Sequence, residues 1–250
     1  MQLTMDKYEP QFYPEILFGG YTRFDGTIEF YTRVRALLDA NCVLVDVGCG
    51  RGEHQEDPLP LRRDLRCFRG TAARVIGLDV DSSGRSNPTI DEFRKLAPDQ
   101  PWPVDDRSAN LVLCDSVIEH LPDPCELFRE ARRVLSPRGY LCIRTTNLLS
   151  YVGLASRLVP NRHHASVLSH TQTKREEKDV FPTLYRCNTV WAIRRELRRH
   201  DFRALVYGHD AGPGYLVFSK IAYAAGFLHQ RIAPGFLRPT IMAFGQLMQG

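Results

Sequence analysis

Short, almost uninterrupted apolar runs recur along the first 150 residues, separated by polar or amphipathic stretches. A parallel sheet that is covered on both faces has strands of this kind, because neither side of the strand meets water. The runs therefore predict buried strands, the third of them shorter than the rest, over residues 42–47, 74–80, 89–96, 110–116 and 139–145.

Apolar residues recur at helical spacing between several of these runs, over residues 27–40, 124–135 and 190–200. A further helix is predicted to begin near Pro58 or Pro60 and to be capped by Gly70, since proline suits the first helical turn and glycine the end. Two more strands are expected over residues 202–207 and 214–219. This alternation of strand and helix predicts an α/β fold.

The domain organisation expected from this pattern has one α/β domain over residues 41–219. Residues 1–40 would form a helical and aromatic cover. Residues 147–186 interrupt the rhythm with a long polar segment, which we interpret as an insertion on the substrate side. Residues 220–250 are apolar and basic, and we expect them to form a C-terminal extension.

A glycine-rich turn follows the first predicted strand, with glycine at the alternate positions 48, 50 and 52. Without Cβ atoms, these residues allow a tight turn and close approach of a ligand to the backbone. Asp46 precedes the turn and suits a ligand that carries an ammonium group, such as the methionine part of S-adenosylmethionine (SAM). Glu53 occupies the position at which a dinucleotide-binding fingerprint needs its last glycine, so NAD is disfavoured.

Asp79 ends the next predicted strand. An acid at this point of a nucleoside-binding α/β fold accepts hydrogen bonds from the ribose hydroxyls. A structural alternative is that Asp79 only caps a turn. The combination of a glycine turn after one strand and an acid at the end of the next favours the binding role.

Four segments carry a family resemblance: VDVGCGRG, VIGLDVD, WPVDDRSANLVLCDSVIEHLPDP and LFREARRVLSPRGYLCIRTTN. In this order they resemble the successive motifs of class I SAM-dependent methyltransferases, over about residues 42–147. The resemblance implies a Rossmann-like, seven-stranded, mostly parallel sheet with helices on both faces and an antiparallel last strand. Residues 53–57, before the helix, are unusual for the family. The third strand lacks its acid–aromatic adenine signature, and we place the adenine edge near residues 96–100.

The resemblance also implies roles for single residues. Gly48, Gly50 and Gly52 would line the methionine side of SAM, with Asp46 near its amino group and Asp79 on the ribose. Val80 would pack against adenine. Asp115 and Ser116 would lie between the cofactor and the acceptor.

Histidines supply the candidate catalytic groups. His120 lies just beyond the fourth predicted strand, and its ordinary pKa suits proton removal from a hydroxyl at neutral pH. Its alternative role is to shape a loop. His163 and His164, with His170, form a second cluster in the polar insertion that is a candidate lid or base. Adjacent histidines without a nearby carboxylate do not favour a metal site, so no metal is expected.

Composition and charge narrow the functional classes. The formal net charge of +4 is too small to indicate a nucleic-acid partner. Seven cysteines, none spaced as CxxC, are interpreted as reduced and structural, which favours a cytoplasmic location. The N-terminal residues do not have the pattern of a signal peptide, and no apolar run is long enough to span a membrane.

Residues 211–250 contain no Asp or Glu, but many apolar residues together with Lys220, Arg231 and Arg238. We interpret this tail as a surface for peripheral membrane contact or for a homodimer. Alternatively, it covers the sheet.

The leading functional hypothesis is O-methylation of a hydroxylated acceptor such as a glycan or glycolipid, by loose similarity to enzymes of bacterial polysaccharide modification. One alternative is a methyltransferase for a small aromatic, quinone or lipid acceptor. Another is a partner protein that binds SAM without catalysis.

Overall fold

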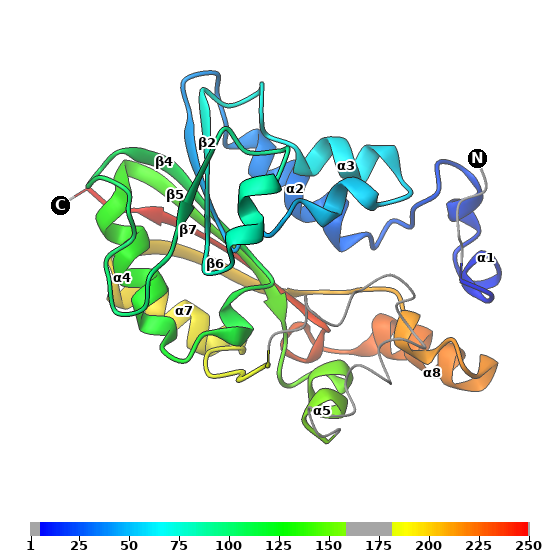
Figure 1. The fold of residues 1–250 in the computed structure, drawn as a ribbon. Helices are drawn as coiled ribbons and strands as arrows, with labels where there is room; N and C mark the ends of the chain where they lie inside the picture. Colours follow the sequence, from blue (N-terminus) through cyan, green and yellow to red (C-terminus); the bar gives the residue numbers. More distant parts are fainter. Residues whose placement is uncertain (1–5, 159–181, 250) are drawn as a thin grey trace.

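The computed structural model describes residues 6–158 and 182–249 and contains one seven-stranded sheet (Figure 1). The strands lie in the order β3-β2-β1-β4-β5-β7-β6. Their bounds are β1 Val43–Val47, β2 Arg74–Asp79, β3 Glu92–Lys95, β4 Ala109–Asp115, β5 Leu135–Thr146, β6 Phe202–His209 and β7 Thr240–Leu247.

Strand β7 is antiparallel to both of its neighbours, β5 and β6, whereas β3, β2, β1, β4 and β5 pair in parallel. The expected seven-stranded sheet with an antiparallel last strand is therefore confirmed. The strand expected over residues 214–219 was wrong, because this segment begins with the short 3-10 helix η6 (Gly214–Leu216). The last strand comes from residues 240–247, so part of the expected C-terminal extension lies within the sheet.

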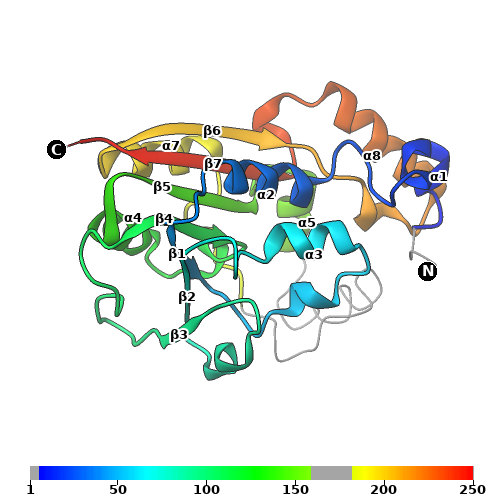
Figure 2. The ribbon, with the colours of Figure 1, turned by 90° about the horizontal axis from the view of Figure 1, so that it is seen from above.

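Helices cover both faces of the sheet, and others stand beyond the edge where the parallel strands end (Figure 2). The α-helices are α1 Glu9–Phe12, α2 Gly26–Ala36, α3 Pro60–Arg66, α4 Pro124–Val134, α5 Tyr151–Leu158, α7 Val190–Arg199 and α8 Lys220–Ile232. The other 3-10 helices are η1 Pro14–Leu17, η2 Glu53–Glu56, η3 Ser82–Ser86, η4 Ile118–His120 and η7 Gly235–Leu237.

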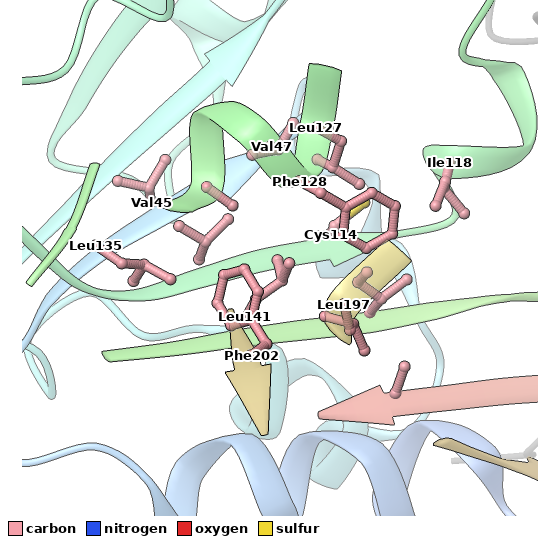
Figure 3. Packing of buried hydrophobic residues seen from close by; sticks show 14 of the residues in the cluster. Val45, Val47, Cys114, Ile118, Leu127, Phe128, Leu135, Leu141, Leu197 and Phe202 are labelled. Atoms are coloured by element: carbon pink, nitrogen blue, oxygen red, sulfur yellow. The ribbon is translucent and has the colours of Figure 1, made fainter. Parts of the chain in front are cut away.

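Two apolar clusters fill the space between the helices and the sheet. On one face, Phe30 and Val34 of α2 pack over Leu44 and Leu111. On the other face, α4 and α7 contribute side chains that meet those of the strands, as Figure 3 shows for Val45, Val47, Cys114, Leu127, Phe128, Leu141, Leu197 and Phe202. Because both sides of β1 and β4 are buried, their sequences contain apolar residues at consecutive positions.

Local capping explains where the helices near the site begin. The Asp25 carboxylate accepts hydrogen bonds from the backbone N–H groups of Thr27 and Ile28, at 3.0 Å each, and so starts α2. Helix α3 begins at Pro60, within the expected start, but ends at Arg66. Gly70 is therefore not its cap; it adopts a φ of +78° in the turn that follows.

All seven cysteines are unpaired, and Cys42, Cys114 and Cys142 are buried. Within residues 6–158 and 182–249, no helix is both long enough and apolar enough to cross a bilayer.

Candidate functional site

The glycine turn follows β1 at the edge of the sheet where the parallel strands end. Gly48, Gly50 and Gly52 have φ values of +71°, +51° and +84°, in the left-handed region that favours glycine. The turn is tied to β2, because Gly48 N donates to Leu78 O at 2.7 Å and Gly50 N donates to Asp79 Oδ2 at 2.9 Å. The backbone of the turn is thus fixed beside the end of the neighbouring strand.

Gly48 has no room for a side chain. A Cβ atom there would lie 2.3 Å from Cγ2 of Val117, which follows β4. Gly48→Ala is therefore expected to reduce the free energy of unfolding by about 1–3 kcal/mol and to weaken SAM binding at least about tenfold. Denaturant titration and calorimetry measure the two effects.

Gly70→Ala is the matched control for this variant. Gly70 also has a positive φ, of +78°, but a Cβ atom would meet nothing within 4 Å. This variant should lose only about 1 kcal/mol from backbone strain and bind SAM normally. Equal SAM affinity in the two variants would show that the close packing of Gly48 against Val117 is not needed for binding.

Three carboxylates lie at the ends of the adjacent strands β2, β1 and β4: Asp79, Asp46 and Asp115. Asp79 is buried, and its two oxygens accept hydrogen bonds from Gly50 N and from Asp81 N, the latter at 2.8 Å. A carboxylate has further acceptor capacity beyond two such bonds, so it can also accept from ribose hydroxyls. Val80 follows directly and is 56% exposed, so its apolar side chain is available to pack against a planar ring.

Asp46 differs from the other two because no described residue forms a hydrogen bond or ion pair with its carboxylate. Burial, together with the negative charge of Asp115, raises the pKa of Asp46 to about 7, and the positive charge of Arg66 opposes this shift. A cationic ligand would relieve this unfavourable environment. The glycine turn, the Asp46 carboxylate, Asp79 and the exposed Val80 together fit the amino group, ribose and adenine of SAM.

Asp115 is occupied by protein groups. Arg144, at the end of β5, donates to both of its oxygens, at 2.8 and 2.6 Å, and the Tyr31 hydroxyl donates to Oδ2 at 2.7 Å. Burial by itself would raise the pKa of Asp115, but Arg144, Arg66 and the Tyr31 hydroxyl together lower it to about 2. Both oxygens of the Asp115 carboxylate are thus held by Arg144, and one of them also by Tyr31.

Ser116 has a positive φ of +59°, uncommon for a residue other than glycine, and its side chain is exposed. Its backbone N–H donates to Arg144 O at 2.9 Å. Backbone of this kind often marks functional positions. Ser116 directly follows β4, and its place between cofactor and acceptor stays a prediction.

Sequence reasoning missed His54 and Arg66 beside this cluster. Burial and the nearby Arg66 lower the pKa of His54 to about 4, and its Nε2 is buried without a hydrogen-bond partner in the described part of the chain. Arg66 lies 3.9 Å from Asp115 and over the ring of Tyr31. No motif marks these residues; only the fold of residues 53–66 over the strand ends brings them there.

His120 lies at the end of η4, and its Nδ1 is 3.0 Å from the backbone oxygen of Pro182. A carbonyl oxygen can only accept, so Nδ1 carries the proton and Nε2 is the basic nitrogen of the neutral ring. The preceding Glu119 is buried and accepts a hydrogen bond from the Thr145 hydroxyl at 2.7 Å. Backbone N–H groups of Leu184 and Tyr185 donate to Glu119 O, which fixes η4 against the end of the insertion.

The second histidine cluster, His163, His164 and His170, lies outside the described residues. Those three predictions stay untested.

Comparison with known proteins gives a consistent result. A sequence profile of the methyltransferase domain matches residues 21–188. A ubiquinone biosynthesis O-methyltransferase of Xanthomonas oryzae is 32% identical over 145 residues, which are 52% of this chain and 58% of the relative. The chain thus spans a little over half the length of the curated relatives it matches.

Solved structures share the fold at low identity. A SAM-dependent methyltransferase from Archaeoglobus fulgidus has a TM-score of 0.54 and 16% identity, covering 93% of this chain and 97% of its own. The cyclase SpnF has a TM-score of 0.53 and 17% identity, covering 89% and 81%. At these identities the structures speak for the fold alone.

Proposed function

The chain belongs to the family of SAM-dependent class I methyltransferases, and on that premise we propose that it methylates a hydroxyl oxygen of a small-molecule acceptor. The observation that carries the proposal is the Asp46 carboxylate beside the glycine turn. No described residue pairs with this carboxylate, so it suits the cationic SAM. O-methylation is supported by the names of the most similar curated relatives.

The acceptor is proposed to be a small phenolic or quinone-like molecule. The relatives named for ubiquinone biosynthesis favour this class, which the sequence alone ranked second. The glycan or glycolipid acceptor gains no support from the relatives. A protein that binds SAM without methyl transfer is the remaining candidate, since a cyclase has the same fold.

When bound, SAM would supply a methyl group on a sulfonium: the acceptor oxygen would attack the methyl carbon in line, and the sulfur would leave as a neutral thioether. The oxygen–carbon bond forms as the carbon–sulfur bond breaks, and the hydroxyl proton must leave the oxygen. We assign its removal to Nε2 of His120. The contact between Nδ1 and Pro182 O keeps the ring in the required tautomer.

His120→Gln is expected to lower kcat by about 10²–10⁴-fold while SAM affinity changes by less than about twofold. The assay uses methyl-labelled SAM with three acceptor sets: substituted phenols, a polyprenylated phenol and oligosaccharides.

His200→Gln is the matched control. Its Nδ1 also lies near a carbonyl oxygen, Glu196 O at 2.9 Å, but His200 follows α7 and stacks on Phe128, away from the strand ends. It should leave kcat unchanged. Full turnover by His120→Gln would show that another group removes the proton. Label only in oligosaccharides would restore the glycan acceptor, and SAM binding without label in any acceptor would favour the non-catalytic alternative.

A further inference from the structure

Helix α8 has an apolar stripe on its outer face. Ile221, Leu228 and Ile232 are 84%, 57% and 71% exposed, and Ala225 between them is also exposed. Their spacing of four, three and four residues places all four on one side of the helix. The stripe is thus an unpartnered apolar face within the described chain.

The opposite face of α8 fixes its orientation. Phe12 of α1 packs on Tyr223 with ring centroids 5.2 Å apart, and the Tyr13 hydroxyl donates to Gln230 Oε1 at 2.5 Å. Gly226 lies so close to Pro213 that a Cβ atom would be 2.6 Å from it. Because this face is packed and hydrogen-bonded, α8 cannot turn its stripe inward without breaking these contacts.

Two further aromatic side chains are exposed outside α8. Phe236 in η7 is 41% exposed and packs against Trp191 at the start of α7, which is 53% exposed, with ring centroids 5.4 Å apart. Trp191 borders a surface hollow of about 450 Å³, lined otherwise by arginines of α7: Arg194, Arg195, Arg198 and Arg199. An indole beside cationic groups is typical of the water–lipid boundary.

Helices α7 and α8 carry mostly positive charges, whereas the acidic Asp6 and Glu9 act on Tyr223, on the packed face of α8. Lys220 and Arg231 lie at the two ends of α8, and residues 211–250 contain no Asp or Glu. In α7 a single acid, the buried Glu196, pairs with Arg195 and Arg199, which leaves a net positive helix. This surface is therefore complementary to anionic headgroups.

A second copy of the chain is a less favourable occupant. A symmetric dimer through the stripe would bring Lys220 and Arg231 of each protomer close to the same residues of its partner. Like charges at that distance oppose association.

We infer that α8 docks on an anionic lipid bilayer, with Ile221, Leu228 and Ile232 entering the headgroup boundary and the arginine hollow of α7 holding lipid phosphates. In Figures 1 and 2, α8 stands beyond the edge of the sheet where β5 ends. Docking there would hold the site close to acceptors that reside in the membrane. The inference does not depend on methyl transfer.

The test is sedimentation of the full chain with phosphatidylcholine vesicles, with and without phosphatidylglycerol. Binding is expected only with phosphatidylglycerol and should weaken as salt rises. The triple variant Ile221→Ser/Leu228→Ser/Ile232→Ser should bind at least about tenfold more weakly, and Arg198→Gln about fivefold more weakly. Circular dichroism and SAM binding confirm that each variant is folded.

Two matched controls have equally exposed side chains elsewhere. Leu205→Ser changes a leucine on β6 that is 58% exposed, and Arg129→Gln changes an exposed arginine on α4. Both should bind vesicles like the unsubstituted chain. Equal binding to neutral and anionic vesicles, or full binding by the triple variant, would overturn the inference. A different result would also overturn it: light scattering shows a dimer, the triple variant abolishes that dimer, and neither protein binds vesicles.

Discussion

Asp46→Asn is expected to weaken SAM binding about 100-fold, which corresponds to about 3 kcal/mol. Asparagine keeps the shape of the side chain but removes the charge that would oppose the ligand ammonium. In the absence of ligand, the same substitution should stabilise the fold, because it removes a partly buried carboxylate that no described cation pairs with. We expect a gain of about 1–2 kcal/mol at pH 8, after allowing for solvent screening.

The pH dependence of both effects follows from the pKa of Asp46, about 7 in the fold against an ordinary value of 3.8. Because the folded state holds the proton more tightly, the stability of the unsubstituted chain falls as pH rises from about 4 to 7, and Asp46→Asn removes this loss. SAM affinity should fall as pH drops below 7, by up to about tenfold per pH unit.

Calorimetry between pH 5 and 7.5 and thermal unfolding at the same pH values check these expectations. Asp81→Asn is the matched control, because Asp81 lies two residues from Asp79 but is exposed and caps η3. Asp81→Asn should change neither the SAM affinity nor the stability of the fold appreciably. Retained, pH-dependent SAM binding in Asp46→Asn would mean that another carboxylate meets the ammonium.

Arg144→Met is expected to destabilise the fold by about 3–5 kcal/mol, the largest loss of any single change considered. The Arg144 and Asp115 side chains are 14% and 8% exposed, so removing the guanidinium leaves a buried carboxylate with the Tyr31 hydroxyl and Arg66, at 3.9 Å, to stabilise it. Arg144 NH1 also donates to the Thr27 hydroxyl of α2 at 2.9 Å, and that link between sheet and helix is lost too.

Arg132→Met tests the same pairing at the surface. Arg132 and Asp201 lie 2.8 Å apart, but their side chains are 53% and 57% exposed, so the loss should not exceed about 1 kcal/mol. The double variant Asp115→Asn/Arg144→Met should recover part of the stability, because no charge is left unpaired. Equal losses for Arg144→Met and Arg132→Met would contradict the role given to the buried pair.

The pH dependence of the Arg144→Met effect has a definite sign. The pKa of Asp115 is lowered to about 2, so its pairing stabilises the fold above pH 4 and is lost as pH falls toward 2. The difference in unfolding free energy between Arg144→Met and the unsubstituted chain should therefore be greatest at neutral pH and shrink on acidification. Urea titrations at several pH values measure it.

The strands nearest the site could be predicted from sequence to within one or two residues. Strands β1, β2 and β4 lie between two helical layers, so burial acts on both of their faces and leaves an unmistakable apolar run. The glycine turn was equally clear, since its φ values exclude most other residues. These patterns involve residues that are close together in the chain, so a single sequence is enough to detect them.

What sequence reasoning missed depends on contacts across the sheet. Only the short η7 separates β7 from α8 in the chain. The apolar residues of β7 resemble those of the helix, so no change of pattern marked the start of the strand. The Asp115–Arg144 pair arises because the two residues are register partners at the ends of β4 and β5. The sequence did offer one signal for this pair, namely residues of opposite charge near the ends of two predicted strands. His54 and Arg66 had none.

The place of β7 in the sheet has a consequence for synthesis of the chain. Strand β6 pairs only with β7, and residues 210–239 separate the two. Until residues 240–247 leave the ribosome, β6 has no neighbour and β5 presents an open edge to other polypeptides. A stop codon between residues 210 and 240 would therefore leave the edges of β5 and β6 that pair with β7 open, and the product would be prone to aggregate although the glycine turn and all three strand-end carboxylates are present.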